Sequence, residues 1–237
     1  GQFSPAGGDG LGESPKRELT KEEKDFLSFL DSDPDVRDAR VVLKSERPTA
    51  EKDKLPDGTY APTRQRLHRR IVESLLNPRA RVAPGETPTL SMIIGPPASG
   101  KSQVIRGKIL LKGKSTIIDA DVVKEYLPDH SPQSAGLEHV ESAEIAEGPL
   151  LSEAVKRRHN IIIDWTGKNT TKNVNLVKEF RRLGYDVDVY HVALPPLEAA
   201  KRAVTRFKEK GRFVDPTYII NEIGDRPDRT YDALKKS

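Results

Sequence analysis

The chain contains no cysteine among its 237 residues. This absence excludes disulfide bonds, thiolate nucleophiles and cysteine-ligated metal sites. The chain also lacks an apolar run of membrane-spanning length, and no secretory hydrophobic segment follows its first residue. We therefore expect a cytoplasmic protein that makes no contact with a membrane.

Neither sign of charge dominates the sequence, and aromatic residues are scarce at 5%. Lysine and arginine number 40 against 36 aspartates and glutamates, which leaves a net charge of +4. Because basic residues are interleaved with acidic ones, the composition does not favour a nucleic-acid surface. The modest basic surplus is equally typical of a protein that binds polyphosphates.

The most informative segment is residues 95–102, with the sequence GPPASGKS, which matches the GxxxxGK[ST] phosphate-binding pattern. An apolar run at 89–94 precedes it and a helix-like segment at 103–110 follows it, as this motif requires. A glycine-rich turn that binds nothing is the alternative, and the flanking strand and helix argue against it. We expect the nucleotide to contact Gly95, Pro96, Pro97, Ala98, Ser99, Gly100, Lys101, Ser102 and Gln103.

The residue types of this loop explain why it would hold phosphates. Its glycines let successive backbone N–H groups line an anion site, and the following helix N-terminus adds partial positive charge. Lys101 would reach the β- and γ-phosphates, and the Ser102 hydroxyl would bind Mg²⁺. The sequence therefore predicts ATP and Mg²⁺ as cofactors.

From residue 89 onward, β-branched apolar runs alternate with helical segments. Three further runs, at 115–119, 160–165 and 186–193, follow the first. This alternation predicts an α/β fold in which a parallel sheet carries helices on both faces. Helices are expected near 122–127, 137–158, 171–183, 196–210 and 216–235.

The chain divides into a disordered tail at 1–15, a helical N-terminal extension at 16–84 and a P-loop domain at 85–237. The tail is rich in Gly, Ser and Pro and nearly free of apolar residues. In the extension, a possible capping box at Thr20 and Glu23 predicts one helix. Helical spacing after Pro62 predicts a second, with a loop-like segment at 46–60 between the two.

Three aspartates stand at the ends of predicted strands, where a parallel sheet binds its ligands. Asp119 and Asp121 follow the apolar run 116–118, and Asp164 follows the run 161–163. A rigid strand end that faces the phosphates suits a metal-binding or catalytic carboxylate. Asp121 also fits a helix N-cap, and the two roles are compatible.

Phosphoryl transfer also needs cations near the developing negative charge. Arg206 and Arg212 are the candidates, the first on a charged helix and the second on the loop after it. Taken singly, both are typical of solvated surface charges. The five histidines show no metal-ligand spacing, and His139, beside Glu138 and Glu141, could border the substrate pocket.

Together these segments resemble the zeta-toxin family of small-molecule kinases, over roughly residues 60–235. The phosphate loop and the segments 118–121 (IDAD), 163–168 (IDWTGK) and 182–187 (RLGYDV) are similar to the family's motifs in order and character. Arg206 and Arg212 fall where the family places two phosphate-clamping arginines. The segment 64–68 looks like the helix that precedes the loop in longer members.

The resemblance implies ATP-dependent phosphorylation of an alcohol group, with residues 85–237 as the kinase domain. The implied acceptor is the 3′-hydroxyl of the sugar in UDP-N-acetylglucosamine, and a ribose hydroxyl of NAD is the alternative. A small antitoxin protein is the expected partner. The implied catalytic residues are Lys101, Asp121 (the general base), Arg206 and Arg212. From these motifs and from the helix around His139, we expect the acceptor to contact Asp119, Asp121, His139, Glu141, Asp164, Thr166 and Lys168, and Mg²⁺ to contact Ser102 and Asp164.

Two other functions remain open on the sequence. A polynucleotide 5′-kinase would need a basic groove, which the even charge mixture does not favour. A nucleotide-binding regulatory module with weak ATPase activity would use the first 85 residues to bind its partner. The helix at 20–30 also raises the hypothesis of a restraint in cis on the catalytic domain, with simple core packing as the alternative.

Overall fold

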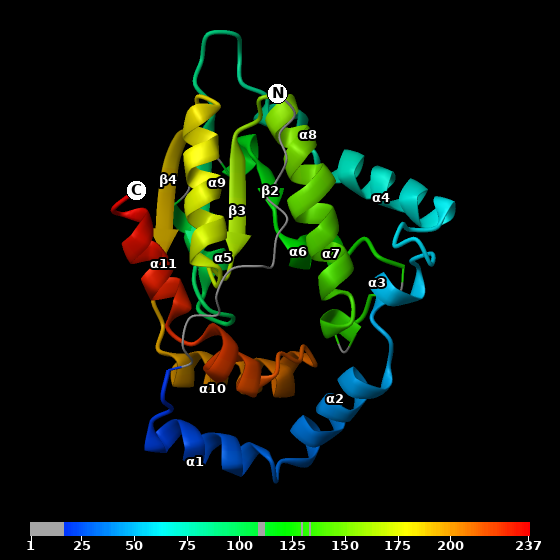
Figure 1. The fold of residues 1–237 in the computed structure, drawn as a ribbon, viewed down its shortest axis with the longest axis vertical. Helices are drawn as coiled ribbons and strands as arrows, with labels where there is room; N and C mark the ends of the chain where they lie inside the picture. Colours follow the sequence, from blue (N-terminus) through cyan, green and yellow to red (C-terminus); the bar gives the residue numbers. More distant parts are fainter. Residues whose placement is uncertain (1–16, 109–111, 129, 133) are drawn as a thin grey trace.

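The computed structural model describes residues 17–108, 112–128, 130–132 and 134–237, so the predicted tail at 1–15 lies outside the described residues. Four strands form one parallel sheet in the order β2–β3–β1–β4 (Figure 1). Each strand lies within a predicted run, which confirms the α/β fold. The strands are β1 (Thr89–Ile94), β2 (Thr116–Ile118), β3 (Ile161–Trp165) and β4 (Asp186–His191).

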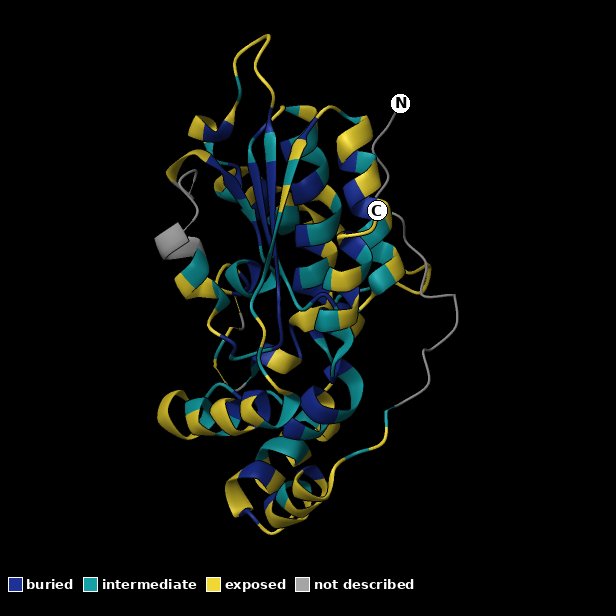
Figure 2. Cartoon of the chain, turned by 90° about the vertical axis from the view of Figure 1, so that its left-hand side faces the viewer, coloured by how far each residue is buried: buried dark blue, intermediate teal, exposed yellow. Residues whose placement is uncertain are grey.

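The main hydrophobic core lies on one face of this sheet. Successive strand residues point to opposite faces, so Ile93 and Ile162 form a smaller buried cluster on the other face. Ile93 and Ile162 are fully buried, and Figure 2 shows dark blue strands in the centre of the sheet, whereas β4 contains no buried residue. The strand residues in the main core are Leu90, Met92, Ile94, Ile118, Ile161 and Ile163.

Helices surround the sheet at the expected places, and two predicted helices are interrupted. The segment predicted as one helix at 137–158 contains the π-helical turn η4 (Ala146–Leu150), because Pro149 has no N–H to donate. The segment 216–235 is divided at Gly224 between η5 (Tyr218–Ile223) and α11. The regular helices of the P-loop domain are α5 (Lys101–Lys108), α6 (Ala120–Lys124), α7 (His139–Ile145), α8 (Leu151–Lys156), α9 (Thr170–Arg182), α10 (Pro196–Lys210) and α11 (Arg226–Leu234). The short 3₁₀ turns are η1 (Pro78–Ala80), η2 (Lys112–Lys114) and η3 (Ser134–Gly136).

The N-terminal extension contains more helix than the sequence predicts. The capping box is confirmed at α1 (Lys21–Leu30), where the Glu23 N–H donates to the Thr20 hydroxyl and the Thr20 N–H donates to the Glu23 carboxylate. α2 (Pro34–Ser45) was not predicted, although Asp33 as N-cap and proline at the first helical position both mark its start. α3 (Thr49–Lys52) interrupts the segment predicted as loop, and α4 (Pro62–Leu75) begins at the predicted proline.

α1 and α2 pack against α10 and the loop that follows it (Figure 1). Leu30 of α1, Val36 of α2 and Phe213 form one buried cluster, to which Phe26 and Phe207 are joined. Leu19, Phe26 and Leu27 also pack against a second cluster built from α10 and η5. The helix predicted at 20–30 therefore docks on the P-loop domain by ordinary apolar packing.

The extension is also bound to the rest of the molecule by charges and by the main core. Lys208 of α10 lies 2.6 Å from the Asp33 carboxylate, and Arg40 of α2 lies 3.2 Å from that of Asp215. α4 places Ile71 and Val72 in the main core, and it packs against η4. Within the described ranges, no helix is both long enough and apolar enough to cross a membrane.

We expect alanine to destabilise the fold more at Gly167 than at Gly184, a glycine with a similar backbone conformation. Gly167 and Gly184 both have left-handed backbones, with φ of +74° and +79°. A Cβ on Gly167 would lie 2.9 Å from the Cβ of the buried Ile94, whereas a Cβ on Gly184 would meet nothing within 4 Å. We expect Gly184→Ala to cost about 1 kcal/mol from backbone strain alone. Gly167→Ala should cost about 1–3 kcal/mol more, because the core has to make room.

Urea unfolding of the two variants and the parent chain measures this difference. Equal losses of unfolding free energy in the two variants would contradict the close approach of Gly167 to the end of β1.

Candidate functional site

The phosphate loop, Asp119 and Asp164 lie where the parallel strands end. β1 runs into the phosphate loop, β2 ends one residue before Asp119, and β3 carries Asp164 at its fourth position. In Figure 1 the arrowheads of β3 and β4 point toward α10, the helix that carries Arg206. The topology therefore brings the loop, the aspartates and the arginine helix to one end of the sheet, as ligand binding in α/β folds requires.

The phosphate loop has the backbone of an anion cradle. Ala98 and Gly100 have positive φ values of 60° and 91°, which turns backbone N–H groups toward one side. Gly95 is needed for close approach, because a Cβ there would lie 2.6 Å from the backbone oxygen of Val192. Ser102 and Gln103, at the start of α5, are exposed.

Lys101 lies inside this loop and is held by backbone oxygens. Its Nζ donates to the carbonyls of Gly95 at 3.0 Å and Pro96 at 3.1 Å, and it lies 3.7 Å from the Asp164 carboxylate. Burial lowers the pKa of Lys101, while the negative charges of Asp164 and Asp119 oppose that shift. Among the described residues, this largely buried ammonium has two carbonyls and one carboxylate at 3.7 Å as partners, which fits a binding site for a further anion.

Asp119 and Asp164 are carboxylates with raised pKa values. Burial, followed by the charges of Asp164 and Asp121, raises the pKa of Asp119 to about 7. Burial also raises the pKa of Asp164, although Lys101 opposes the shift. Asp119 accepts a hydrogen bond from the Asp121 N–H at 2.8 Å and so caps α6. The N-cap position expected for Asp121 is therefore occupied by Asp119.

Asp121 is ionised and is paired with two cations. Its carboxylate accepts from Lys124 at 2.9 Å and from the guanidinium of Arg212, which reaches it from the loop after α10. Partial burial would raise the pKa of Asp121, but Lys124 and Arg212 outweigh it and hold the pKa well below its usual range. Lys124 was not predicted as a site residue, and its position three residues after Asp121 was the available signal.

Arg206 lies near Asp121 and Arg212, and one of its N–H donors has no partner among the described residues. Its buried Nε has no hydrogen bond to any described residue. Burial lowers the pKa of Arg206, and the neighbouring positive charge of Arg212 adds to the shift. A half-buried guanidinium with an unused donor fits an anionic ligand.

The remaining predicted site residues lie on α7 and just after β3. His139 is exposed at the surface of α7. Partial desolvation of its ring, with the positive charges of Lys124 and Arg212, lowers its pKa. Asp121 and Glu147 act on it in the opposite direction. α7 packs against α6, and His139 is therefore near enough to Asp121 and Lys124 for their charges to act on it.

The segment after β3 contains both predicted and unpredicted polar contacts. Thr166 accepts weakly from the Lys168 N–H at 3.4 Å, and the Lys168 ammonium lies 5.0 Å from the centre of the Tyr218 ring. Sequence reasoning missed Lys172, which binds Glu147 and lies 5.1 Å from the centre of the Trp165 ring. No local pattern marks this pair, because Lys172 and Glu147 are 25 residues apart.

The position of the Glu141 side chain does not fit the predicted contact with the acceptor. Its side chain is fully buried, and its oxygens bind Arg64 at 2.6 and 2.8 Å and His68 at 2.7 Å. Both partners belong to α4, on the side of α7 away from His139. The carboxylate is fully engaged within the protein, so we assign it a structural contact.

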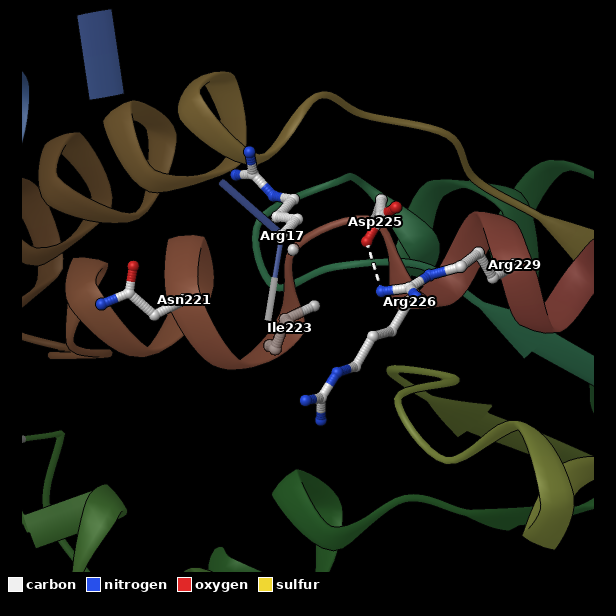
Figure 3. Close-up of a pocket in the computed structure, with 7 residues that line it drawn as sticks. Arg17, Asn221, Ile223, Asp225, Arg226 and Arg229 are labelled. Atoms are coloured by element: carbon white, nitrogen blue, oxygen red, sulfur yellow. Dashed lines mark hydrogen bonds and ion pairs between the residues drawn. The ribbon is translucent and has the colours of Figure 1, made fainter. Parts of the chain in front are cut away.

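The pocket in Figure 3 is a separate feature, where the start of α1 meets η5 and α11. Arg229 binds Asp225 there at 2.7 Å, and Arg17 binds Glu23 on α1. None of the predicted site residues lines this pocket. Across the parts of the chain that the structure describes, no group of three histidine or acidic side chains could hold a metal ion.

Comparison with known proteins finds the family that the sequence motifs resemble. A family model described as Zeta toxin matches residues 73–236. A structure from the PezAT chromosomal toxin–antitoxin system of Streptococcus pneumoniae is 21% identical, with a TM-score of 0.53, over 75% of this chain and 72% of that one. No curated protein sequence matches the chain.

Two structures of the AvrRxo1-ORF1:AvrRxo1-ORF2 complex are also similar. The complex with ATP is 17% identical with a TM-score of 0.61, over 81% of this chain and 69% of that one. The complex with sulphate ions is 19% identical with a TM-score of 0.59, over 76% of this chain and 61% of that one. At these identities the likeness establishes the shared fold.

The raised pKa of Asp119 predicts a pH-dependent stability. The pKa is about 7 in the folded chain and about 3.9 in an unfolded one. Between these values the folded chain keeps a proton that the unfolded chain has lost, so this group lowers stability as pH rises toward 7. Asp119→Asn removes that titration and keeps an acceptor for the Asp121 N–H. The fall in Tm between pH 5 and pH 8 should therefore be smaller in Asp119→Asn than in the parent chain.

Thermal unfolding at the two pH values tests this expectation. Asp186→Asn, an exposed carboxylate at the start of β4, is the control and should keep the parent's pH dependence. The same pH dependence in Asp119→Asn and the parent would contradict the buried, titrating carboxyl.

Proposed function

This chain belongs to the zeta toxin family of P-loop kinases, and on that premise we propose that it transfers the γ-phosphoryl group of ATP to a hydroxyl of a nucleotide-type metabolite. The observation that carries this proposal is the charged cluster at the strand ends, in which Asp121 binds Lys124 and Arg212 beside the phosphate loop. A carboxylate to take the hydroxyl proton and cations to stabilise the phosphoryl group are what this reaction needs.

Asp121 is the proposed general base. While it is bound by Lys124 and Arg212, its lowered pKa makes it a weak one. Movement of the Arg212 guanidinium from Asp121 to the transferred phosphoryl group would remove one of these contacts and raise the basicity of the carboxylate. Arg212 would thus couple the arrival of negative charge to the activation of the base.

Arg206 and Lys101 are the proposed fixed cations. The unpartnered Nε of Arg206 supports a contact with phosphate oxygens. Lys101 holds the two loop carbonyls of Gly95 and Pro96, and it could exchange them for phosphate oxygens without leaving the loop. Both side chains are desolvated, which strengthens their attraction for an anion.

The residues available for Mg²⁺ are Ser102 and Asp164. One hydroxyl and one carboxylate match the way proteins hold this ion, which keeps waters and phosphate oxygens as its other ligands. When bound, ATP supplies the phosphoryl group and Mg²⁺ neutralises part of its charge. The backbone of residues 95–103 would orient the phosphates against Lys101.

We propose the 3′-hydroxyl of UDP-N-acetylglucosamine as the acceptor to test first, and a ribose hydroxyl of NAD as the alternative. Asp119 directly follows β2, His139 is on α7, and Thr166 and Lys168 follow β3. We propose that these four side chains contact the acceptor. The charges of Asp121 and Arg212 act on the pKa of His139, which supports a contact between His139 and an acceptor bound at Asp121.

We also propose a protein partner that restrains the enzyme. The PezAT structure comes from a toxin–antitoxin system, and the AvrRxo1-ORF1 structures contain AvrRxo1-ORF2 as a second component. A partner of the antitoxin kind would cover the phosphate loop. Restraint in cis by α1 stays a hypothesis beside the apolar packing described above.

The roles of Asp121 and Lys101 predict different losses. Asp121→Asn should bind ATP as the parent does and lose about 10²–10⁴-fold in phosphoryl transfer, because the hydroxyl proton has no acceptor. Lys101→Ala should lose both nucleotide affinity and transfer. Calorimetric ATP titration, together with the mass shift of UDP-N-acetylglucosamine or NAD in the presence of ATP and Mg²⁺, measures both quantities.

Asp186→Asn is the matched control and should transfer at the parent's rate. Normal transfer by Asp121→Asn would remove Asp121 as the base. No mass shift on either acceptor, with ATP still bound, would favour the nucleotide-binding regulatory module.

A further inference from the structure

A buried ion pair joins α4 to α7, on the opposite side of α7 from the charged cluster. Glu141 is fully buried and Arg64 is only 9% exposed. The Arg64 Nε donates to one carboxylate oxygen at 2.6 Å, and its Nη2 donates to the other at 2.8 Å, so the pair is bidentate. His68, one turn further along α4, contacts the same carboxylate at 2.7 Å. Burial would raise the pKa of Glu141, but the hydrogen bonds from Arg64 and His68 lower it to about 2.

The same face of α7 is tied to the segment around α3 at two further points. Glu144, three residues after Glu141, binds the Lys54 ammonium at 2.7 Å and the Tyr60 hydroxyl at 2.6 Å. Just before α7, the Leu137 carbonyl accepts from the Thr49 N–H at 3.1 Å. The α3–α4 region therefore holds α7 along its whole length.

His139 is on the other side of this short helix. It precedes Glu141 by two residues, which separates the two side chains by about 200° around the helix axis. The charged groups that act on His139 are Lys124, Asp121, Glu147 and Arg212, which lie on α6, on η4 and on the loop after α10. One side of α7 is thus fixed by α4, and the other faces the proposed reaction site.

A buried ion pair is a costly way to pack two helices. Desolvation offsets most of its attraction, and apolar side chains of similar volume stabilise such sites equally well or better. What a bidentate arginine–carboxylate pair supplies is a fixed relative orientation. A fixed orientation is what a helix needs when it presents a side chain to a reacting group.

We propose that Arg64 and Glu141 are positioning residues for phosphoryl transfer, which set the orientation of α7 and so hold His139 beside Asp121. This inference rests on the proposed kinase function. Because Arg64 is on α4, the proposal also makes this helix part of the catalytic unit. Arg64 and His68 lie before residues 73–236, the segment that the family model matches. The acceptor side of the site depends on this pair, whereas the phosphate loop, on β1 and α5, does not touch it.

The test compares conservative and apolar replacements in the full chain. Arg64→Lys keeps the charge and loses the fork, Glu141→Gln keeps the shape and loses the charge, and the double variant Arg64→Met/Glu141→Met replaces the pair with apolar volume. Arg69→Lys, an exposed arginine on the same helix, is the matched control. UDP-N-acetylglucosamine and NAD are the acceptor probes, with KM and kcat measured for each, beside ATP affinity and Tm.

We expect the double variant to fold with an unchanged or higher Tm and to bind ATP normally. Its kcat/KM for the acceptor should fall at least tenfold, and Arg64→Lys should show the same split while Arg69→Lys matches the parent. The NMR titration of the His139 ring gives a second readout, and in the double variant it should move toward that of a free histidine. If the double variant does not fold, Arg64→Lys and Glu141→Gln are judged by the same readouts.

A folded double variant with the parent's acceptor kinetics and His139 titration would overturn the proposal and leave the pair a packing role. If the parent phosphorylates neither probe, the proposed function fails separately, and the His139 titration still decides whether the pair positions α7.

Discussion

Asp119, Asp121 and Asp164 lie close together around Lys101 at the carboxyl end of the sheet, and neighbouring positive charges offset part of their mutual repulsion. Burial, with the repulsion of neighbouring carboxylates, raises the pKa values of Asp119 and Asp164, while Lys124 and Arg212 hold the pKa of Asp121 well below its usual range. Arg212 reaches Asp121 across 91 positions of sequence. The loop after α10 is therefore held to the sheet by the charge of the same carboxylate that we assign to the chemistry.

This dependence gives the N-terminal helices a physical role. α1 and α2 pack against α10 and Phe213, next to the loop that carries Arg212, and Lys208 and Arg40 add ion pairs to the same contact. α3 and α4 continue from there to α7, where Arg64 binds Glu141 (Figure 1). The extension thus contacts the loop after α10, which carries Arg212, and α7, which carries His139. The phosphate loop lies between β1 and α5, and its Ala98 packs against the cluster of α10 and η5.

The sequence predicts the sheet and the phosphate loop well, because both are local patterns: β-branched runs that end in glycine or aspartate, and fixed spacing around Lys101. It misses α2, although Asp33 and Pro34 mark its start, and it does not place the break at Pro149. Contacts such as Lys172 with Glu147, or Glu141 with Arg64, depend on how distant helices pack, and neither residue type nor spacing reveals them. Glu141 therefore looked like a pocket residue when its carboxylate is buried against α4.

On the proposed mechanism, Arg212 leaves Asp121 when a triphosphate enters the loop. A crystal structure of the full chain with Mg²⁺ and a non-hydrolysable ATP analogue tests it most directly. We expect the Arg212 guanidinium to contact the γ-phosphate and the Asp121 carboxylate to keep Lys124 as its charged partner. An unchanged Arg212–Asp121 pair beside a fully bound triphosphate would contradict it.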